Sequence, residues 1–162
     1  MKTFHDPDHA LHESHSELHE GRLVRSFECP ERMRFVLDAM AAAGFAAPER
    51  PAPVPMELLE RVHTPDYLRF LETAHDRWVA TYGGGEAVAF AWPVPGLRRT
   101  RPPEVIDGAI GHYNFSVDTC ITAGTWTAAT AAAACAHAAA GVVAAGQGPA
   151  FALARPPGHH AH

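Results

Sequence analysis

Two adjacent histidines, His159 and His160, follow a short run of residues that is typical of a strand and a turn. The small and apolar residues at 149–154 predict a buried strand. Arg155-Pro156-Pro157-Gly158 then ends it, because proline lacks an amide donor and glycine permits a turn. In an α/β sheet, ligands bind beyond the carboxyl ends of the strands. The pattern therefore predicts that both imidazoles stand where chemistry is usually done.

A second group of histidines lies near the start of the sequence. Its members recur every three or four residues and on a helix would share one face: His5, His9, His12, His15 and His19. Such a stripe could bind a metal ion, but Pro7 interrupts its start and no cysteine joins it. The favoured interpretation is a solvated or cleft-lining loop, with a metal site as the minority alternative.

The composition is that of a soluble globular protein. The 162 residues are 47% hydrophobic and 19% charged, which fits one domain. Thirteen basic and eighteen acidic residues give a net charge of −5, which disfavours nucleic-acid binding. Three cysteines without a CxxC pair, and a start that lacks the apolar region of a signal peptide, favour the cytoplasm. We expect no membrane association, because the most apolar region, 128–145, is only weakly hydrophobic.

Several helices but only two strands are predicted. Apolar spacing and flanking proline or glycine residues indicate helices at 30–43, 56–62 and 64–82, a weaker one at 106–115, and an alanine-rich one from 125 to about 140. We expect one face of the 64–82 helix to point into the core: Tyr67, Leu71, Ala74 and Trp78. The strands are 2–5 and 149–154, whereas 7–29 and 83–103 are predicted loops. Two strands are marginal as a sheet, so the helices are expected to cover a larger one.

Several of these stretches, taken together, resemble the histone deacetylase superfamily of zinc amidohydrolases, and within it the bacterial acetylpolyamine amidohydrolases. The resemblance rests on Arg155-Pro156-Pro157-Gly158-His159-His160-Ala161, preceded in family order by Asp8-His9, Val62-His63-Thr64-Pro65-Asp66-Tyr67-Leu68, Phe70-Leu71-Glu72-Thr73-Ala74, Ile110-Gly111-His112-Tyr113 and Gly124-Thr125-Trp126. It covers essentially the whole chain but about the first half of the family's domain. An arginase-like ureohydrolase is an alternative at the level of fold, which the tandem-histidine motif disfavours.

The resemblance implies an α/β fold of the arginase/deacetylase type, three layers with a central parallel sheet, of which residues 1–162 form the N-terminal, helix-rich portion of a single domain. It implies a zinc ion that polarises an acetyl carbonyl and activates water. His160 would match the general base and acid of the reaction, and His159 its partner. Imidazole suits both roles because its pKa lies near working pH.

The resemblance also implies a substrate, a small cationic acetylated amine such as an acetylpolyamine. Asp107 and Asp118 match acidic positions near the mouth of the family's channel, Glu17 matches an acidic position in the first loop, and His19 stands where a tyrosine is common. Both aspartates are one methylene shorter than the usual glutamates. A solvated helix face is the alternative for these aspartates. The resemblance further implies a homodimer formed through the N-terminal loops, to which the first loop contributes.

The family's zinc ligands, an Asp and a His on the next strand and a later Asp, would lie after His162, so no metal ligand is assigned in this chain. A catalytic zinc site requires three protein ligands and an open position. We therefore expect the chain to be the N-terminal portion of a deacetylase without activity of its own. A non-catalytic half-domain, or an interaction fragment, is the alternative.

Overall fold

A computed structural model describes residues 1–94, 96, 101–118 and 120–158. The chain forms two compact units that interleave along the sequence. The first unit comprises Met1–Glu13, Glu28–Leu59 and the chain from Gly124 onward, and the second comprises Ser14–Phe27 and Glu60–Ala123.

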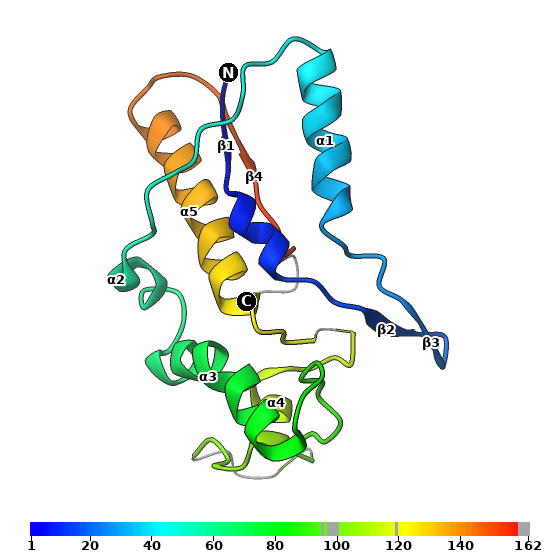
Figure 1. Cartoon of the computed structure of the whole chain (residues 1–162). Helices are drawn as coiled ribbons and strands as arrows, with labels where there is room; N and C mark the ends of the chain where they lie inside the picture. The colour runs from blue at the N-terminus through cyan, green and yellow to red at the C-terminus, as the bar shows by residue number, and fades with distance from the viewer. Residues whose placement is uncertain (95, 97–100, 119, 159–162) are drawn as a thin grey trace. The chain divides into compact units, whose positions relative to one another are not determined.

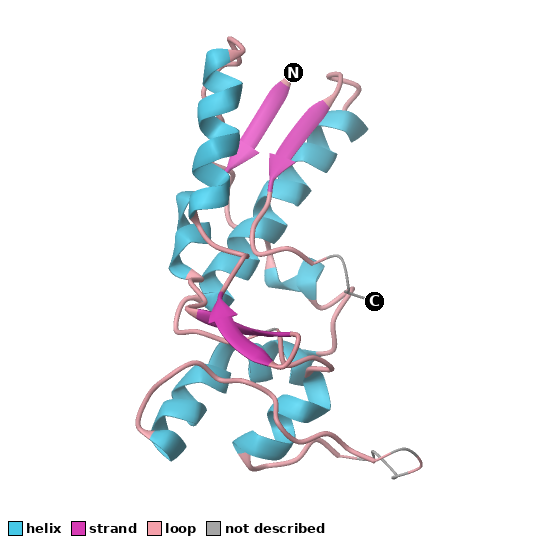
Figure 2. Ribbon diagram, turned by 90° about the vertical axis from the view of Figure 1, so that its right-hand side faces the viewer, coloured by secondary structure: helices cyan, strands magenta, loops and turns pink. Residues whose placement is uncertain are grey.

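The first unit contains a parallel sheet built from the two predicted strands. Strand β1 (Lys2–His5) pairs with β4 (Ala150–Leu153), in a register that runs from Lys2 opposite Ala150 to His5 opposite Leu153. The two arrows run in the same direction in Figure 2. On the other side of β1, the backbone of Glu49 donates to Thr3 O over 2.8 Å and accepts from His5 N over 3.1 Å. A third backbone segment, at Glu49, therefore extends the hydrogen-bonded sheet beyond β1 and β4.

Helix α5 (Thr125–Ala144) lies along this sheet (Figure 1). Cys135, Ala139 and Val142 pack against Phe4 of β1, with Ala150 and Ala152 of β4 beside them. Small side chains on α5 let the helix approach the strands closely, and parallel sheets are normally covered by helices in this way. By length and composition alone α5 could cross a membrane, although a third of its most apolar window is already buried within the protein. The parallel sheet with its helix confirms the predicted α/β class.

The remaining elements of the first unit are η1 (Pro7–Leu11), α1 (Glu31–Ala42) and α2 (Met56–Leu59). The helices predicted at 30–43 and 56–62 are confirmed as α1 and α2, although α2 ends three residues earlier than expected, whereas η1 lies in a segment that was predicted as a loop. Of the apolar side chains on α1, Met33 is buried, whereas Val36 is 40% and Phe35 63% exposed. The amphipathic pattern of α1 therefore correctly predicted a helix but not the burial of its whole face.

A β-hairpin opens the second unit, where a polar loop was predicted. Strand β2 (Ser16–His19) pairs antiparallel with β3 (Arg22–Arg25), and Leu18 stands opposite Leu23. The turn between them is Glu20 (φ 49°) and Gly21 (φ 77°), both in the left-handed region. Two consecutive residues with positive φ match the right-handed twist of paired strands. The loop prediction for this segment was wrong.

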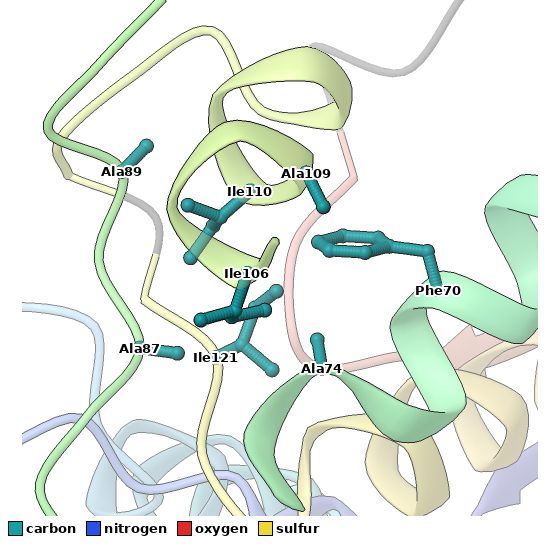
Figure 3. Packing of buried hydrophobic residues seen from close by; sticks show 8 residues of the cluster. All are labelled: Phe70, Ala74, Ala87, Ala89, Ile106, Ala109, Ile110 and Ile121. Carbon is teal, nitrogen blue, oxygen red and sulfur yellow. The ribbon is translucent and has the colours of Figure 1, made fainter. Parts of the chain in front are cut away.

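Helices α3 (Pro65–Tyr82) and α4 (Ile106–Tyr113) form the core of the second unit. Figure 3 shows Phe70 and Ala74 of α3 facing Ile106, Ala109 and Ile110 of α4. The cluster is completed from two flanking segments by Ala87, Ala89 and Ile121, and the backbones of Ala87 and Ile121 exchange two hydrogen bonds. Tyr67, Leu71 and Trp78 pack against the cluster, which confirms that this face of α3 points into a core.

The five N-terminal histidines do not share a helical face. His5 lies on β1, His9 in η1 and His19 at the end of β2, while His12 and His15 stand outside these elements. His9 and His12 are buried, so the segment that contains them is not a fully solvated loop. The spacing of three and four residues was therefore coincidental, because two changes of secondary structure interrupt it.

Candidate functional site

The tandem histidines His159 and His160 lie outside the described residues, and the described chain leads up to them through the end of β4. Arg155 follows that strand and is only 3% exposed. Its Nε donates to Glu28 Oε1 over 2.8 Å, and its Nη1 donates to the carbonyl oxygen of His9 over 2.6 Å. The guanidinium thereby joins the end of β4 to η1 and to Glu28, three positions before the first residue of α1. Its role was not predicted, although a charged residue directly after a buried strand was a signal.

The His9 ring lies near this arginine and makes a tilted contact with the His5 ring, with 49° between the ring planes. Their ring centroids are 4.9 Å apart. Burial lowers the pKa of His9 below its ordinary value, and the nearby positive groups of His5 and Arg155 lower it further. Burial also lowers the pKa of His5. Both imidazoles are therefore neutral at neutral pH, which avoids adding charge beside a buried guanidinium.

The start of α5 is fixed to η1 by another buried contact. The Nδ1 of His12 and the Oγ1 of Thr125 are 2.8 Å apart. Gly124 lies so close to the backbone of Leu11 that a Cβ at this position would overlap it. Packing against η1 and His12 therefore explains why glycine and threonine suit positions 124 and 125 in this structure.

Glu17 and His19, two of the predicted substrate-binding residues, lie two positions apart on β2 of the second unit. Glu17 Oε2 accepts from Ser26 Oγ over 3.3 Å and from the backbone N–H of Phe27 over 3.2 Å. The His19 ring contacts the edge of the Phe27 ring, with centroids 5.5 Å apart. The hairpin therefore brings these two residues together around Phe27.

Asp107 and Asp118, the other two, have separate partners in the second unit. Asp107 stands in the first turn of α4, and its Oδ1 accepts from the Tyr82 hydroxyl over 2.6 Å. This hydrogen bond raises the pKa of Tyr82. Asp118 is exposed, and its Oδ2 accepts from Ser116 Oγ over 3.2 Å. All four side chains thus belong to one unit, but their described hydrogen bonds do not converge on a shared partner.

A hydrogen-bonded pair of a tyrosine and an aspartate was not predicted from the sequence. The Tyr113 hydroxyl of α4 donates to Asp66 Oδ2 of α3 over 2.7 Å. Hydrogen bonds from Thr64 and Tyr113 lower the pKa of Asp66 to about 2. Burial, together with the hydrogen bond to Asp66, raises the pKa of Tyr113 to about 12. Arg69 and Arg77 line a shallow cleft of about 190 Å³ beside this pair. Because a tyrosine with this pKa stays protonated, the pair serves to hold α3 and α4 together.

The described residues do not fit a zinc site. In 1–94, 96, 101–118 and 120–158, no group of three or more His, Cys, Asp or Glu side chains is placed to hold a metal ion. A catalytic zinc ion needs three such ligands. His5 and His9 lie side by side but supply only two imidazole rings, and the Arg155 guanidinium near His9 disfavours a further cation there. No chemical step is therefore assigned to a metal held by these residues.

Known proteins resemble this chain over nearly its whole length. It is 45% identical to the acetylpolyamine amidohydrolase of Mycoplana ramosa and 40% identical to the acetylpolyamine amidohydrolase 2 of Pseudomonas aeruginosa, in each case over 99% of this chain. It covers 47% and 46% of those two proteins, so the chain spans about half the length of the curated relatives it matches.

A solved structure agrees with these sequence matches. The crystal structure of the acetylpolyamine aminohydrolase from Burkholderia pseudomallei superposes on all of this chain and on 46% of its own, with a TM-score of 0.87 and 34% identity. A family model described as the histone deacetylase domain matches residues 26–162, from the end of the hairpin through β4 and the tandem histidines. Sequence motifs, parallel sheet and matched relatives agree, and the chain belongs to the histone deacetylase domain family.

Proposed function

We propose that this chain forms the N-terminal part of a deacetylase that hydrolyses N-acetyl amides of polyamines or of similar small amines. The observation that carries the proposal is the identity of 45% to an acetylpolyamine amidohydrolase over 99% of this chain. The match covers both units, so the aligned region includes the hairpin, the carboxylate-bearing segments and the end of β4. The proposal concerns the whole protein that such a chain would belong to.

Carboxylates on the second unit support the choice of a cationic substrate. Glu17, Asp107 and Asp118 supply negative charge, and Asp118 is the one of these three that is exposed. An ammonium group near an exposed carboxylate gains up to about 1 kcal/mol, because water and salt screen the attraction. In this proposal the carboxylates select an amine over a neutral amide, and His19 borders the same site on the hairpin.

Proton transfer is assigned to the tandem histidines. In this proposal His160 takes a proton from the attacking water and delivers it to the leaving amine, so that acetate and a free amine result. His159 supports it by positioning that water. A neutral imidazole with a pKa near neutrality can act first as the base and then as the acid. The described residues fit no zinc site, so zinc and its ligands belong to the remainder of the proposed enzyme.

A chimaera tests the proposal directly. This chain would replace the matched N-terminal part of the Mycoplana ramosa protein, and acetate release from N-acetylputrescine would be measured with zinc present. We expect turnover by the chimaera and none by the 162-residue chain alone. His160→Ala should abolish turnover without changing the far-ultraviolet circular dichroism spectrum. A folded chimaera that releases no acetate would contradict the proposed function and favour a non-catalytic half-domain.

The carboxylates are tested in the same chimaera. Asp118→Asn should raise KM for N-acetylputrescine about fivefold and leave kcat within about twofold, because an exposed ion pair contributes equally to ground state and transition state. Asp76→Asn is the matched control, since Asp76 is an exposed aspartate of α3 in the same unit. An equal change in KM for both variants would show that only the overall charge matters.

A further inference from the structure

Arg155 is a buried cation held by two partners from distant parts of the chain. Its side chain is 4% exposed, compared with 23% for that of Glu28. Removing a guanidinium from water is costly unless charge and hydrogen bonds compensate for it. Glu28 Oε1 supplies the charge at 2.8 Å from Nε, and the His9 carbonyl supplies the second acceptor at 2.6 Å from Nη1. Since both acceptors are separated from Arg155 by more than 100 residues, the fold itself creates this environment.

The pair is more than a surface ion pair. Arg32 Nη1 also lies 3.9 Å from Glu28 Oε1, but the Arg32 side chain is 63% exposed, so its contribution is small. Arg155 Nη2 is buried and has no hydrogen-bond partner among the described residues, a donor that an ordered water would satisfy. The planar guanidinium presents its donors in a fixed fork, so two simultaneous acceptors set both its position and its orientation.

We propose that Arg155 is a positioning residue, whose hydrogen bonds to Glu28 and to the His9 carbonyl fix the end of β4 from which the chain continues to His159 and His160. This inference rests on the proposed function, because that function is what gives His159 and His160 a chemical role that depends on their position. Pro156 and Pro157 follow at once, and each proline ring fixes one backbone angle. A displacement at Arg155 is therefore passed on to Gly158 with less loss to backbone rotation than in a segment without proline.

Lysine in place of Arg155 separates positioning from charge. Arg155→Lys keeps the positive charge beside Glu28, but an ammonium cannot reproduce the two-acceptor geometry of the fork. In the chimaera we expect kcat to fall about ten- to a hundredfold with KM within about twofold, because a misplacement of about 1 Å can cost a factor of about 100. Glu28→Gln keeps the shape of the acceptor and should give a smaller loss of kcat.

Arg50→Lys is the matched control. Arg50 belongs to the same unit and pairs with Asp6 and Asp8, but its side chain is 57% exposed. We expect its kcat and KM to equal those of the unmodified chimaera. If Arg155→Lys and Arg50→Lys have equal kcat values per folded molecule, Arg155 is not a positioning residue.

A second measurement uses the 162-residue chain itself and does not depend on activity. In ¹H–¹⁵N spectra, Arg155→Lys and Glu28→Gln should both shift the Gly158 amide, whereas Arg50→Lys should not. An inactive unmodified chimaera with these shifts present would contradict the proposed function and leave the positioning role supported. An unshifted Gly158 amide in both variants would overturn the positioning role, whatever the chimaera does.

Discussion

Gly111→Ala tests how closely α4 packs against the backbone at Ala91. We expect this substitution to destabilise the protein, whereas glycine-to-alanine changes inside helices usually stabilise it. Replacing glycine by alanine inside a helix normally stabilises it by about 1 kcal/mol. At Gly111, however, a Cβ would overlap the carbonyl oxygen of Ala91 and stand 2.8 Å from its carbonyl carbon. Trp92 Cα would be a further close neighbour at 3.4 Å. These atoms belong to backbone, which cannot rotate away as a flexible side chain could.

The magnitude follows from two opposing effects. Overpacking a well-filled interior costs about 1–3 kcal/mol, and the overlap at Gly111 lies at the severe end because the residue is buried in the second unit. Subtracting a helix-propensity gain of about 1 kcal/mol leaves an expected loss of about 1–2 kcal/mol in the free energy of unfolding. In a chain of this size each kcal/mol corresponds to about 2–4 °C in Tm.

Gly141 of α5 is the matched control. It is also a helical glycine, but it is exposed and an added Cβ would meet no atom within 4 Å. Gly141→Ala should therefore stabilise the chain by about 0.5–1 kcal/mol. Urea unfolding of both variants, followed by circular dichroism, measures the two effects, provided that the slope of the unfolding free energy stays unchanged. If Gly111→Ala proves as stable as the unmodified chain or more so, the close approach of α4 to Ala91 is wrong.

Two further predictions concern titratable groups. The pKa of Tyr113 is raised to about 12, so its contribution to stability is complete below its ordinary pKa of about 10 and is lost as the pH rises toward 12. Tyr113→Phe, which keeps the ring but not the hydroxyl that binds Asp66, should therefore show a weaker loss of stability between pH 9 and 11 than the unmodified chain in urea unfolding; equal losses would contradict the assignment. Burial raises the pKa of the Cys135 thiol, so iodoacetamide at pH 8 should modify the half-buried Cys29 well before Cys135, as peptide mass spectrometry would show; similar rates would mean that Cys135 of α5 is not buried against Phe4 of β1.

Helices were predictable where their signals are local. Pro65 occupies the first turn of α3, and Gly83 ends it with a left-handed φ of 80°, so both limits could be recognised from residue types alone. The predicted end of α5 near residue 140 was too early, because the helix continues through Gly141 to Ala144. One helical glycine costs about 1 kcal/mol, which the surrounding alanines and the packing of Val142 offset.

The hairpin and the arginine network were not predictable in the same way. The β2–β3 turn uses Glu20 and Gly21, which lack the Asn-Gly or Asp-Gly signal of a tight hairpin, and frequent histidines obscured the alternation around Leu18. Arg155 depends on Glu28 and on the His9 carbonyl, which are distant in the sequence. Local spacing predicts how a segment folds, but such contacts follow only from how segments are assembled.

The three proposed carboxylates differ in how readily they could bind an ammonium group. Glu17 Oε2 already accepts from the Ser26 hydroxyl and the Phe27 amide, so an amine at that oxygen would compete with two donors that shape the loop. Asp107 Oδ1 accepts a short bond from Tyr82, which leaves its second oxygen for a ligand. Asp118 is exposed and its Ser116 contact is longer, at 3.2 Å. Because a carboxylate with fewer and longer hydrogen bonds has less to exchange on binding, Asp118 should contribute most to amine affinity and Glu17 least.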